Sequence, residues 1–461
     1  MSVEQIQMEC VKIHEVIKQK NFPLAESMAC ALIEQTPDSP DAIFVLGSVY
    51  QVTGRFGLAL QFYNRVLGMA PASVPVLNNI GGCYHQCHDD EKSFKYYTTA
   101  YNLSGGKDVD VLSNLAGLSV NTNHPAIGLQ YSDKVMEIKP DHPNSLWNRS
   151  LLELALEDWE NGFKHYEAGI VTGDRKLKDY NLPLWDGEEI ESVVVCGEQG
   201  IGDELMFSSI LEDLFTRVKR IILDCHPRLA SIFEGHRAKI DNPDNLIIVP
   251  NRKVKETEYI RLYDVKAHMN IGSLGQFFRK KDSDFPRTTY LLPNSNYVNY
   301  FKKRFNSNKL CVGVSWFGGA SSTRADLRSI PLEYMIPFLN MENIHFVNLQ
   351  YNVSKKDLDL FYNKTGIRLY HYCTEDDFYA WAMLACSVDL VVTVCNSMAH
   401  LCGAFGLPCI CLTPMQPAWR YGLVKDKMTW YDSVKLIRQK ENDEWSHVIV
   451  ELMQEVKKYV Y

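Results

Sequence analysis

A glycine-rich loop in the segment VVVCGEQGIGDELMF carries the residue types best suited to chemistry. A β-branched run enters three glycines, Gly197, Gly200 and Gly202, and Asp203 and Glu204 follow directly. Glycines after a strand let the backbone approach a ligand, and the amides at the start of the next helix favour an anion. The glycines read GxxGxG, whereas a dinucleotide-binding loop reads GxGxxG. A dehydrogenase is therefore disfavoured.

The acids of this loop have a structural and a chemical interpretation. Asp203 stands where a helix begins, so it can be an N-cap or a first-turn acid favoured by the helix dipole. It can also be a general base that takes a proton from a hydroxyl nucleophile. Glu204 has the same alternatives. Glu198 and Gln199 are expected to line the loop, where a sugar or an acceptor would contact them.

A second polar loop, VSWFGGASSTRADLRSIP, follows another apolar run. Arg324 and Arg328 can present forked donors to phosphate oxygens, although either can equally be a solvated surface arginine. Polar loops at strand ends are where binding groups collect, which favours Arg328 for function. Ser315 is expected beside the phosphates, and Trp316 and Gly318 are expected to shape the loop.

A third segment, VTVCNSMAHLCGAFGLP, reads as a strand followed by a helix. Asn396 or Ser397 would cap the helix, and with the amides of Met398 and Ala399 they could hold a diphosphate. His400 falls in the first turn and has an ordinary structural role as its alternative.

A fourth segment, TPMQPAWRYG, ends a further strand. Trp419 and Arg420 would either cover the sugar end of a ligand or pack the edge of the domain. No HExxH, GKS or GxSxG pattern occurs, so metal-dependent hydrolysis, P-loop phosphoryl transfer and serine hydrolysis have no support.

Alternating strands and helices are predicted to position these loops. SVVVCG, RIILDCH and NLIIVP are short β-branched runs separated by helical patterns, which predicts a parallel sheet over 185–300. A second set over 308–461 comprises LCVGVSWFGG, IHFVNLQ, DLVVTVC and PCICLTP. The polar stretch 285–308 is the expected hinge. Two such Rossmann-like lobes would face each other across one ligand-binding cleft.

Residues 1–180 contain an internal repeat of about 34 residues. Gly47 and Gly81 mark one small position, and Tyr63 and Tyr97 mark a large one. This spacing is the tetratricopeptide (TPR) pattern of stacked helix pairs, here four to five of them. The resulting α-solenoid has a concave groove that typically holds a protein segment. A spacer or a homo-oligomerisation surface is the alternative.

Composition restricts the partners. The 461 residues are 46% hydrophobic and carry a net charge of −8, which argues against nucleic acid or an anionic membrane as the main partner. No apolar run reaches the length of a membrane span, and the N-terminal sequence lacks the features of a secretion signal. Thirteen cysteines without a CxxC pair indicate buried thiols in a reducing compartment. We therefore expect a cytoplasmic protein without a metal site.

The order of these segments resembles that of a known family. PLWDGEEI, GEQGIGDELMF, VGVSWFGG, RSIPLEYMIPFL, SMAHLCGAFGLPCICL and WYDSVKLIRQ resemble, in sequence, the TPR-containing glycosyltransferases related to the lipopolysaccharide heptosyltransferases of glycosyltransferase family 9. The resemblance implies an α-solenoid joined to a GT-B pair of lobes. It also implies inverting sugar transfer without a metal, with a nucleotide sugar as co-substrate and no separate cofactor. The acceptor would enter from the first lobe and the donor would bind the second.

The resemblance also implies roles for individual residues. Asp203 falls where relatives keep an aspartate proposed as the base, and Arg328 falls where they keep a basic residue on the donor phosphates. Cys395 replaces an acidic residue, so a hydrogen bond to the donor would be missing and activity could be weaker. Glu204 stands where relatives often have threonine, which could change the acceptor or affect Asp203 by like-charge repulsion.

Three functions follow from these features. The first is a glycosyltransferase that modifies a protein held by the repeats, for example flagellin or another surface protein. The second is an enzyme of envelope or capsule polysaccharide assembly. The third is a catalytically degenerate scaffold that binds partners through the repeats.

Overall fold

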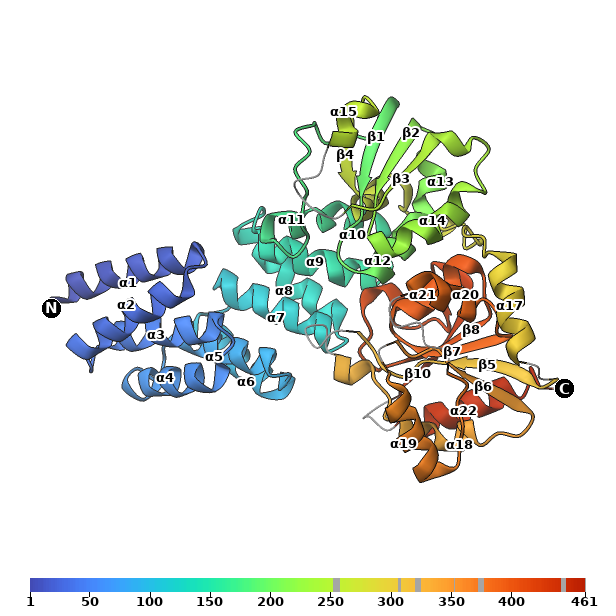
Figure 1. Cartoon of the computed structure of the whole chain (residues 1–461). Helices are drawn as coiled ribbons and strands as arrows, with labels where there is room; N and C mark the ends of the chain where they lie inside the picture. Colours follow the sequence, from blue (N-terminus) through green and yellow to red (C-terminus); the bar gives the residue numbers. More distant parts are fainter. Residues whose placement is uncertain are drawn as a thin grey trace. The chain divides into compact units, whose positions relative to one another are not determined.

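The chain forms two compact units, Met1–Leu152 and Glu153–Tyr461 (Figure 1). The structure is a computed structural model. It describes residues 1–251, 258–305, 308–319, 325–351, 353–371, 377–440 and 445–460. No helix among these residues is long and apolar enough to cross a membrane.

The first unit is a TPR-like solenoid of helix pairs, as the repeat predicts. Asp89 and Asp108 illustrate how the helices begin, because each side chain accepts the amide of a residue three positions on. The helices are α1 (Val3–Lys18), α2 (Phe22–Gln35), α3 (Pro40–Val52), α4 (Phe56–Met69), α5 (Val74–Gln86), α6 (Asp90–Leu103), α7 (Val109–Asn121), α8 (Pro125–Ile138) and α9 (Pro143–Ala155), the last of which continues into the second unit.

The repeating glycines allow the paired helices to pack closely. A Cβ on Gly47 would lie 2.7 Å from the Tyr63 ring, and a Cβ on Gly81 would lie 2.6 Å from the Tyr97 ring. Both tyrosine rings are buried. The small and large positions of the repeat are therefore complementary surfaces of one helix pair.

The second unit begins with two short helices and continues as two α/β sheets. The helices are α10 (Trp159–Tyr166) and α11 (Ala168–Thr172). The first sheet is wholly parallel, in the order β3-β2-β1-β4. Its strands are β1 (Ile190–Cys196), β2 (Val218–Asp224), β3 (Leu246–Val249) and β4 (Ala267–Asn270).

The second sheet has the order β6-β5-β7-β8-β10-β9, and among its described strands only the β9–β10 pair is antiparallel. Its strands are β5 (Leu310–Val314), β6 (Ile344–Asn348), β7 (Leu390–Val394), β8 (Cys409–Thr413), β9 (Lys427–Met428) and β10 (Tyr431–Arg438). One wholly parallel sheet and one largely parallel sheet thus confirm the predicted α/β class. The strands β4, β9 and β10 were not predicted from the sequence.

Helices accompany both sheets. Those of the first part are α12 (Ile201–Phe207), α13 (Leu211–Leu214), α14 (Ala230–Arg237), α15 (Glu258–Leu262) and α16 (Gly275–Phe278). Those of the second are α18 (Ile336–Leu339), α19 (Lys355–Thr365), α20 (Phe378–Ala385), α21 (Ser397–Phe405) and α22 (Ser446–Val456).

The structure adds local detail to two of the predictions. The single helix expected after β1 is broken between α12 and α13, where the Ser208 and Ser209 hydroxyls donate to the carbonyls of Leu205 and Met206. The stretch expected as a hinge contains α17 (Ser295–Phe305).

Candidate functional site

The glycine loop after β1 meets the start of α21, which follows β7. A Cβ on Gly202 would lie 3.1 Å from Cδ2 of His400 and 3.4 Å from Cα of Ser397. Only a residue without a side chain fits this approach comfortably. The contact brings together the carboxyl ends of strands from both sheets, which is where ligands bind in open α/β sheets.

The Asp203 carboxylate contacts two partners. It is the third residue of α12, and its Oδ2 accepts the amide of Gly200 at 3.1 Å. Its Oδ1 forms an ion pair with Nε of Arg420. Each of these two side chains is 18% exposed. The carboxylate therefore acts as a first-turn helix acid and also links the two α/β parts.

Arg420 connects Asp203 to the glycine loop. Its Nη2 donates to Oε1 of Gln199 at 3.1 Å, and its guanidinium lies 5.0 Å from the ring centre of Trp419. Burial is the largest effect on the pKa of Arg420 and lowers it, but the Asp203 carboxylate together with Tyr166 and Tyr421 outweighs burial, so the net pKa is raised and the group stays charged.

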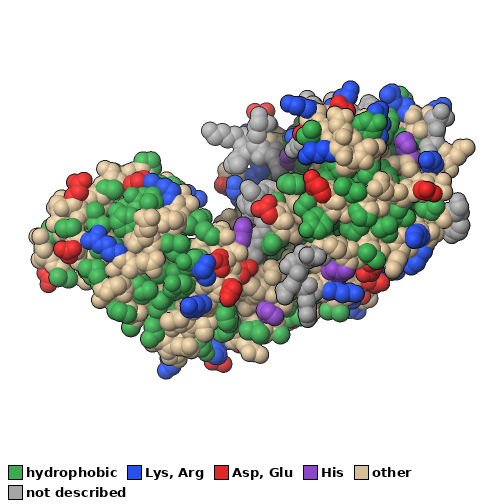
Figure 2. Space-filling view, turned by 90° about the horizontal axis from the view of Figure 1, so that it is seen from below, with side chains coloured by type: hydrophobic (Ala, Val, Ile, Leu, Met, Phe, Trp, Pro, Cys, Tyr) green, Lys and Arg blue, Asp and Glu red, His purple; other side chains and the backbone are tan. Residues whose placement is uncertain are grey.

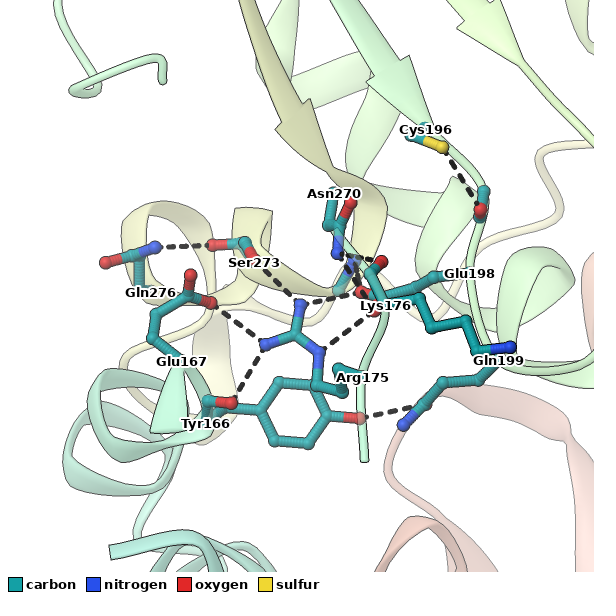
Figure 3. Close-up of polar contacts among 12 residues, drawn as sticks. Tyr166, Glu167, Arg175, Lys176, Cys196, Glu198, Gln199, Asn270, Ser273 and Gln276 are labelled. Carbon is teal, nitrogen blue, oxygen red and sulfur yellow. Dashed lines mark hydrogen bonds and ion pairs between the residues drawn. The ribbon is translucent and has the colours of Figure 1, made fainter. Parts of the chain in front are cut away.

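Gln199 has a strained backbone held by its neighbours. Its φ is +59°, a left-handed conformation that costs a non-glycine residue roughly 1–2 kcal/mol. The hydroxyl of Tyr166 donates to the same Oε1 atom at 3.0 Å that Arg420 contacts (Figure 3). Strain maintained in this way is typical of functional loops.

Glu198 was expected to contact a ligand, and the structure places it in the interior instead. Arg175 donates to Glu198 through Nε at 3.0 Å and Nη2 at 2.6 Å, and Asn270 and the amide of Gly272 complete its shell (Figure 3). The Glu198 side chain is only 2% exposed. Its role is to fix the loop rather than to face a substrate.

Glu204 also lies in the interior. It is 1% exposed, and its Oε2 accepts the amide of His226 at 2.8 Å. A Cβ on Gly197 would lie 2.4 Å from the Glu204 carboxylate, so this glycine leaves room for the acid. Glu204 is therefore poorly placed for the ligand contact expected of it.

Trp419 is packed rather than presented to a ligand. It is 5% exposed, and its ring centre lies 6.1 Å from those of Phe163 and Tyr166 and 6.4 Å from that of Phe207. This burial favours the packing alternative over a sugar contact for Trp419.

Asn396 and Ser315 hold the second loop in place. Asn396 caps α21 by accepting the amide of Met398 at 2.9 Å, and its Nδ2 donates to Ser315 Oγ at 3.0 Å. Ser315 in turn donates to Oε1 of Gln350 at 3.1 Å. That oxygen also accepts the amide of Trp316 at 2.9 Å. Gln350 was not predicted, although its place after a strand made it a candidate.

Arg328 lies next to the same helix start. Its Nη1 donates to the carbonyl of Cys395 at 3.1 Å, and its side chain is half-buried. A Cβ on Gly318 would lie 3.0 Å from Cβ of Arg328, so the absence of a side chain at Gly318 leaves room for this arginine. Arg324, the other predicted phosphate ligand, lies outside the described residues. Ser397 and Ala399 lie in the first turn of α21, as expected. The amides of Met398 and Ala399, which were expected to hold a diphosphate, donate instead to Oδ1 and to the carbonyl of Asn396, at 2.9 and 3.3 Å.

His400 is a buried residue of α21. It is 4% exposed, and burial lowers its pKa to about 4. Its Nε2 lies 3.4 Å from the Tyr421 hydroxyl and its Nδ1 lies 3.5 Å from the Tyr431 hydroxyl. A neutral imidazole between two phenols fits the structural alternative.

Arg175 is the main residue that sequence reasoning missed. It is held within RKLKDY, a segment that reads as a solvated basic stretch. Besides Glu198 it donates to the carbonyl of Tyr166 at 2.9 Å and to Ser273 Oγ at 2.7 Å (Figure 3). Its partners are distant in sequence, so no local pattern signals them.

Comparisons with known proteins give a limited result. No family model matches the chain. The chain is 22% identical over 519 aligned residues to Protein FlbA of Caulobacter vibrioides, covering 94% of this chain and 86% of FlbA. It is 20% identical over 176 residues to the DnaJ homolog subfamily C member 7 homolog of Dictyostelium discoideum, covering 35% of this chain and 33% of that protein.

Solved structures with some similarity include pilF of Pseudomonas aeruginosa, with a TM-score of 0.34, 18% identity and coverage of 46% of this chain and 86% of that one. A thermophilic TPR protein of Thermus thermophilus has a TM-score of 0.33, 10% identity and coverage of 37% and 92%. The match to FlbA spans both units of this chain.

Proposed function

We propose that this chain is an inverting glycosyltransferase with GT-B architecture that moves a sugar from a nucleotide sugar to an acceptor hydroxyl without a metal. The supporting observation is the close approach of Gly202, the residue before Asp203, to the start of α21 at the carboxyl ends of strands from two largely parallel sheets. A donor at α21 and an acceptor at the glycine loop would then approach each other closely.

The proposed step is a single displacement. The acceptor hydroxyl oxygen attacks the anomeric carbon while Asp203 accepts its proton, and the bond from that carbon to the diphosphate oxygen breaks. Arg328 and the positive end of the α21 helix dipole stabilise the negative charge that develops on the leaving diphosphate.

The repeats supply the acceptor in this proposal. TPR-like solenoids are protein-binding surfaces, and several large apolar side chains of this unit are exposed, among them Met8, Leu24, Phe94 and Ile127. Hydrophobic side chains cover much of the face of this unit that Figure 2 shows. A surface protein such as flagellin is the acceptor class we favour. Transfer to an envelope or capsule polysaccharide is the alternative.

One observation favours a scaffold as second candidate. The Asp203 carboxylate is ion-paired with Arg420, and Ser315 and Asn396 hydrogen-bond to each other. A degenerate enzyme could retain such a closed arrangement and act through the repeats alone.

Sugar transfer by the Asp203→Asn variant separates these functions. The purified chain would be incubated with nucleotide sugars, and release of nucleoside diphosphate and mass increase of a candidate acceptor would be measured. We expect Asp203→Asn to reduce transfer by about 10²-fold or more, because a positioned base contributes that much. Asp359→Asn, at an exposed position of α19, is the charge-matched control. Undiminished transfer by Asp203→Asn would remove Asp203 as base, and an inactive wild type would favour the scaffold.

A further inference from the structure

The pair formed by Asp203 and Arg420 joins the proposed base to a cation beside the proposed donor site. Asp203 follows β1 of the first sheet, whereas Arg420 follows β8 of the second. Each side chain is 18% exposed, so solvent reaches the pair but does not surround it. In this arrangement the base cannot accept a proton without competing with a guanidinium.

Arg420 lies close to the start of α21. The hydroxyl of the next residue, Tyr421, donates to the carbonyl of Asn396 at 3.4 Å. On the other side of the pair, Gly202 adjoins Asp203 in sequence and approaches Ser397 closely. The guanidinium, the carboxylate and the helix start therefore belong to one small region, and a long arginine side chain can change partners by torsional rotation alone.

Two anions can compete for this guanidinium. Arginine binds carboxylates and phosphates with the same planar fork of donors, and a diphosphate offers more oxygen acceptors and more charge than one carboxylate. Gln199, the other partner of Arg420, is neutral and would not oppose the exchange.

We propose that Arg420 exchanges partners during the reaction: it pairs with Asp203 when no donor is bound and moves to the diphosphate of the nucleotide sugar when the donor binds, which releases Asp203 to act as base. This inference rests on the proposed function and adds a residue that senses the donor. It makes the base available only after the donor is in place, which would limit wasteful proton transfer before donor binding.

The exchange has a thermodynamic consequence opposite to that of a plain structural ion pair. Breaking the Asp203–Arg420 pair is part of the cost of binding a diphosphate. Removing the carboxylate should therefore tighten diphosphate binding, but only while Arg420 is present. If the pair were purely structural, changing Asp203 would weaken diphosphate binding or leave it unchanged, and the effect would not depend on Arg420.

A double-mutant cycle on the full chain tests the exchange. Binding of UDP, GDP and ADP would be measured by calorimetry for the wild type, Asp203→Asn, Arg420→Gln and the double variant, with Arg420→Lys as the conservative variant and Arg220→Gln as a charge control at an exposed position. Thermal unfolding would verify that each variant is folded. Arg420→Lys keeps a cation and should bind better than Arg420→Gln.

We expect Asp203→Asn to tighten the Kd of the bound nucleotide about threefold to tenfold, in line with the strength of a partly exposed ion pair. Arg420→Gln should weaken it by about tenfold or more, as expected for loss of a charged hydrogen bond. In the Arg420→Gln background, Asp203→Asn should have no effect.

Other outcomes separate the two proposals. If the wild type binds a nucleotide and Asp203→Asn leaves the Kd unchanged or weaker, the exchange is wrong while the proposed function stands. Equal tightening by Asp203→Asn in both backgrounds would show a general charge effect and would also overturn the exchange. If the wild type binds none of the three nucleotides, both proposals fail.

Discussion

At the scale of single residues, the second unit depends on charges that are buried only with a complete set of partners. Arg175 is the clearest case, since its side chain is 0% exposed and its guanidinium lies 4.2 Å from the ring centre of Tyr166. Ion pairs of this kind contribute little net free energy of folding relative to apolar packing. Removing one partner, however, leaves the other as an uncompensated buried charge. Their value here is positional, because Glu198 begins the glycine loop.

We predict that Arg175→Met lowers the free energy of unfolding of the second unit by about 3–5 kcal/mol, because it leaves the Glu198 carboxylate buried without its cation. Urea unfolding followed by tryptophan fluorescence measures this, since seven of the eight tryptophans lie in the second unit. Arg220→Met is the matched control at an exposed position. If Arg175→Met left the free energy of unfolding nearly unchanged, water would have to reach the Glu198 carboxylate freely.

A second residue-scale prediction concerns His236, which is fully buried. Both of its ring nitrogens lack a hydrogen-bond partner among the described residues, and burial, with a smaller effect of Lys239, lowers its pKa to about 4. The unfolded chain binds this proton near pH 6.5, so the stabilising contribution is complete above that pH and is lost as the pH falls towards 4.

We therefore expect the free energy of unfolding to decrease by about 3 kcal/mol through His236 alone between pH 6.5 and 4. The His236→Leu variant should show a shallower pH dependence over that window and equal or greater stability at about pH 7. Urea titrations at a series of pH values measure both. An identical slope in wild type and variant would contradict the assignment.

At the scale of elements, helices and strands could be predicted wherever the sequence has a regular pattern of residue types. The repeat glycines and the β-branched strands each lie in a pattern that one sequence displays directly, and the structure confirms them. Arg175 and Glu198 are 23 residues apart with no shared period, so their pairing emerges only from the fold. The same applies to Trp419, whose aromatic partners include residues of α10 and α12. The sequence indicated that Gly202 allows a close backbone approach, but it did not indicate that α21 is the element approached.

The helix pairs of the repeats allow a prediction with an internal control. Gly81→Ala should destabilise the first unit by about 1–3 kcal/mol, because the new methyl group would overlap the Tyr97 ring. Gly68→Ala in α4 meets open space and should stabilise by about 0.4–1 kcal/mol by restricting the unfolded chain. Thermal unfolding followed by far-ultraviolet circular dichroism compares the two. Equal effects would show that the helix pair adjusts to the added volume.

At the scale of the whole molecule, residues that follow the repeats belong physically to the α/β part. Tyr166 and Arg175 precede β1, yet their hydrogen bonds hold Gln199 and Glu198 of the glycine loop. The contacts of the chain accordingly place the division after Leu152 rather than shortly before the first strand. The position of a truncation should therefore matter more than its length.

We predict that a fragment of residues 153–461 folds and gives the proposed nucleotide binding with the affinity of the full chain, whereas a fragment of residues 183–461 is less stable and binds weakly. The shorter fragment lacks Arg175, so Glu198 remains buried without its cation, and it also lacks the Tyr166 hydroxyl that helps to hold Gln199 in its left-handed conformation. Limited proteolysis, urea unfolding and nucleotide titration compare the two fragments with the full chain. Equal stability and affinity of the two fragments would show that the loop keeps its conformation unaided, and the positioning role of Tyr166 and Arg175 would then be wrong.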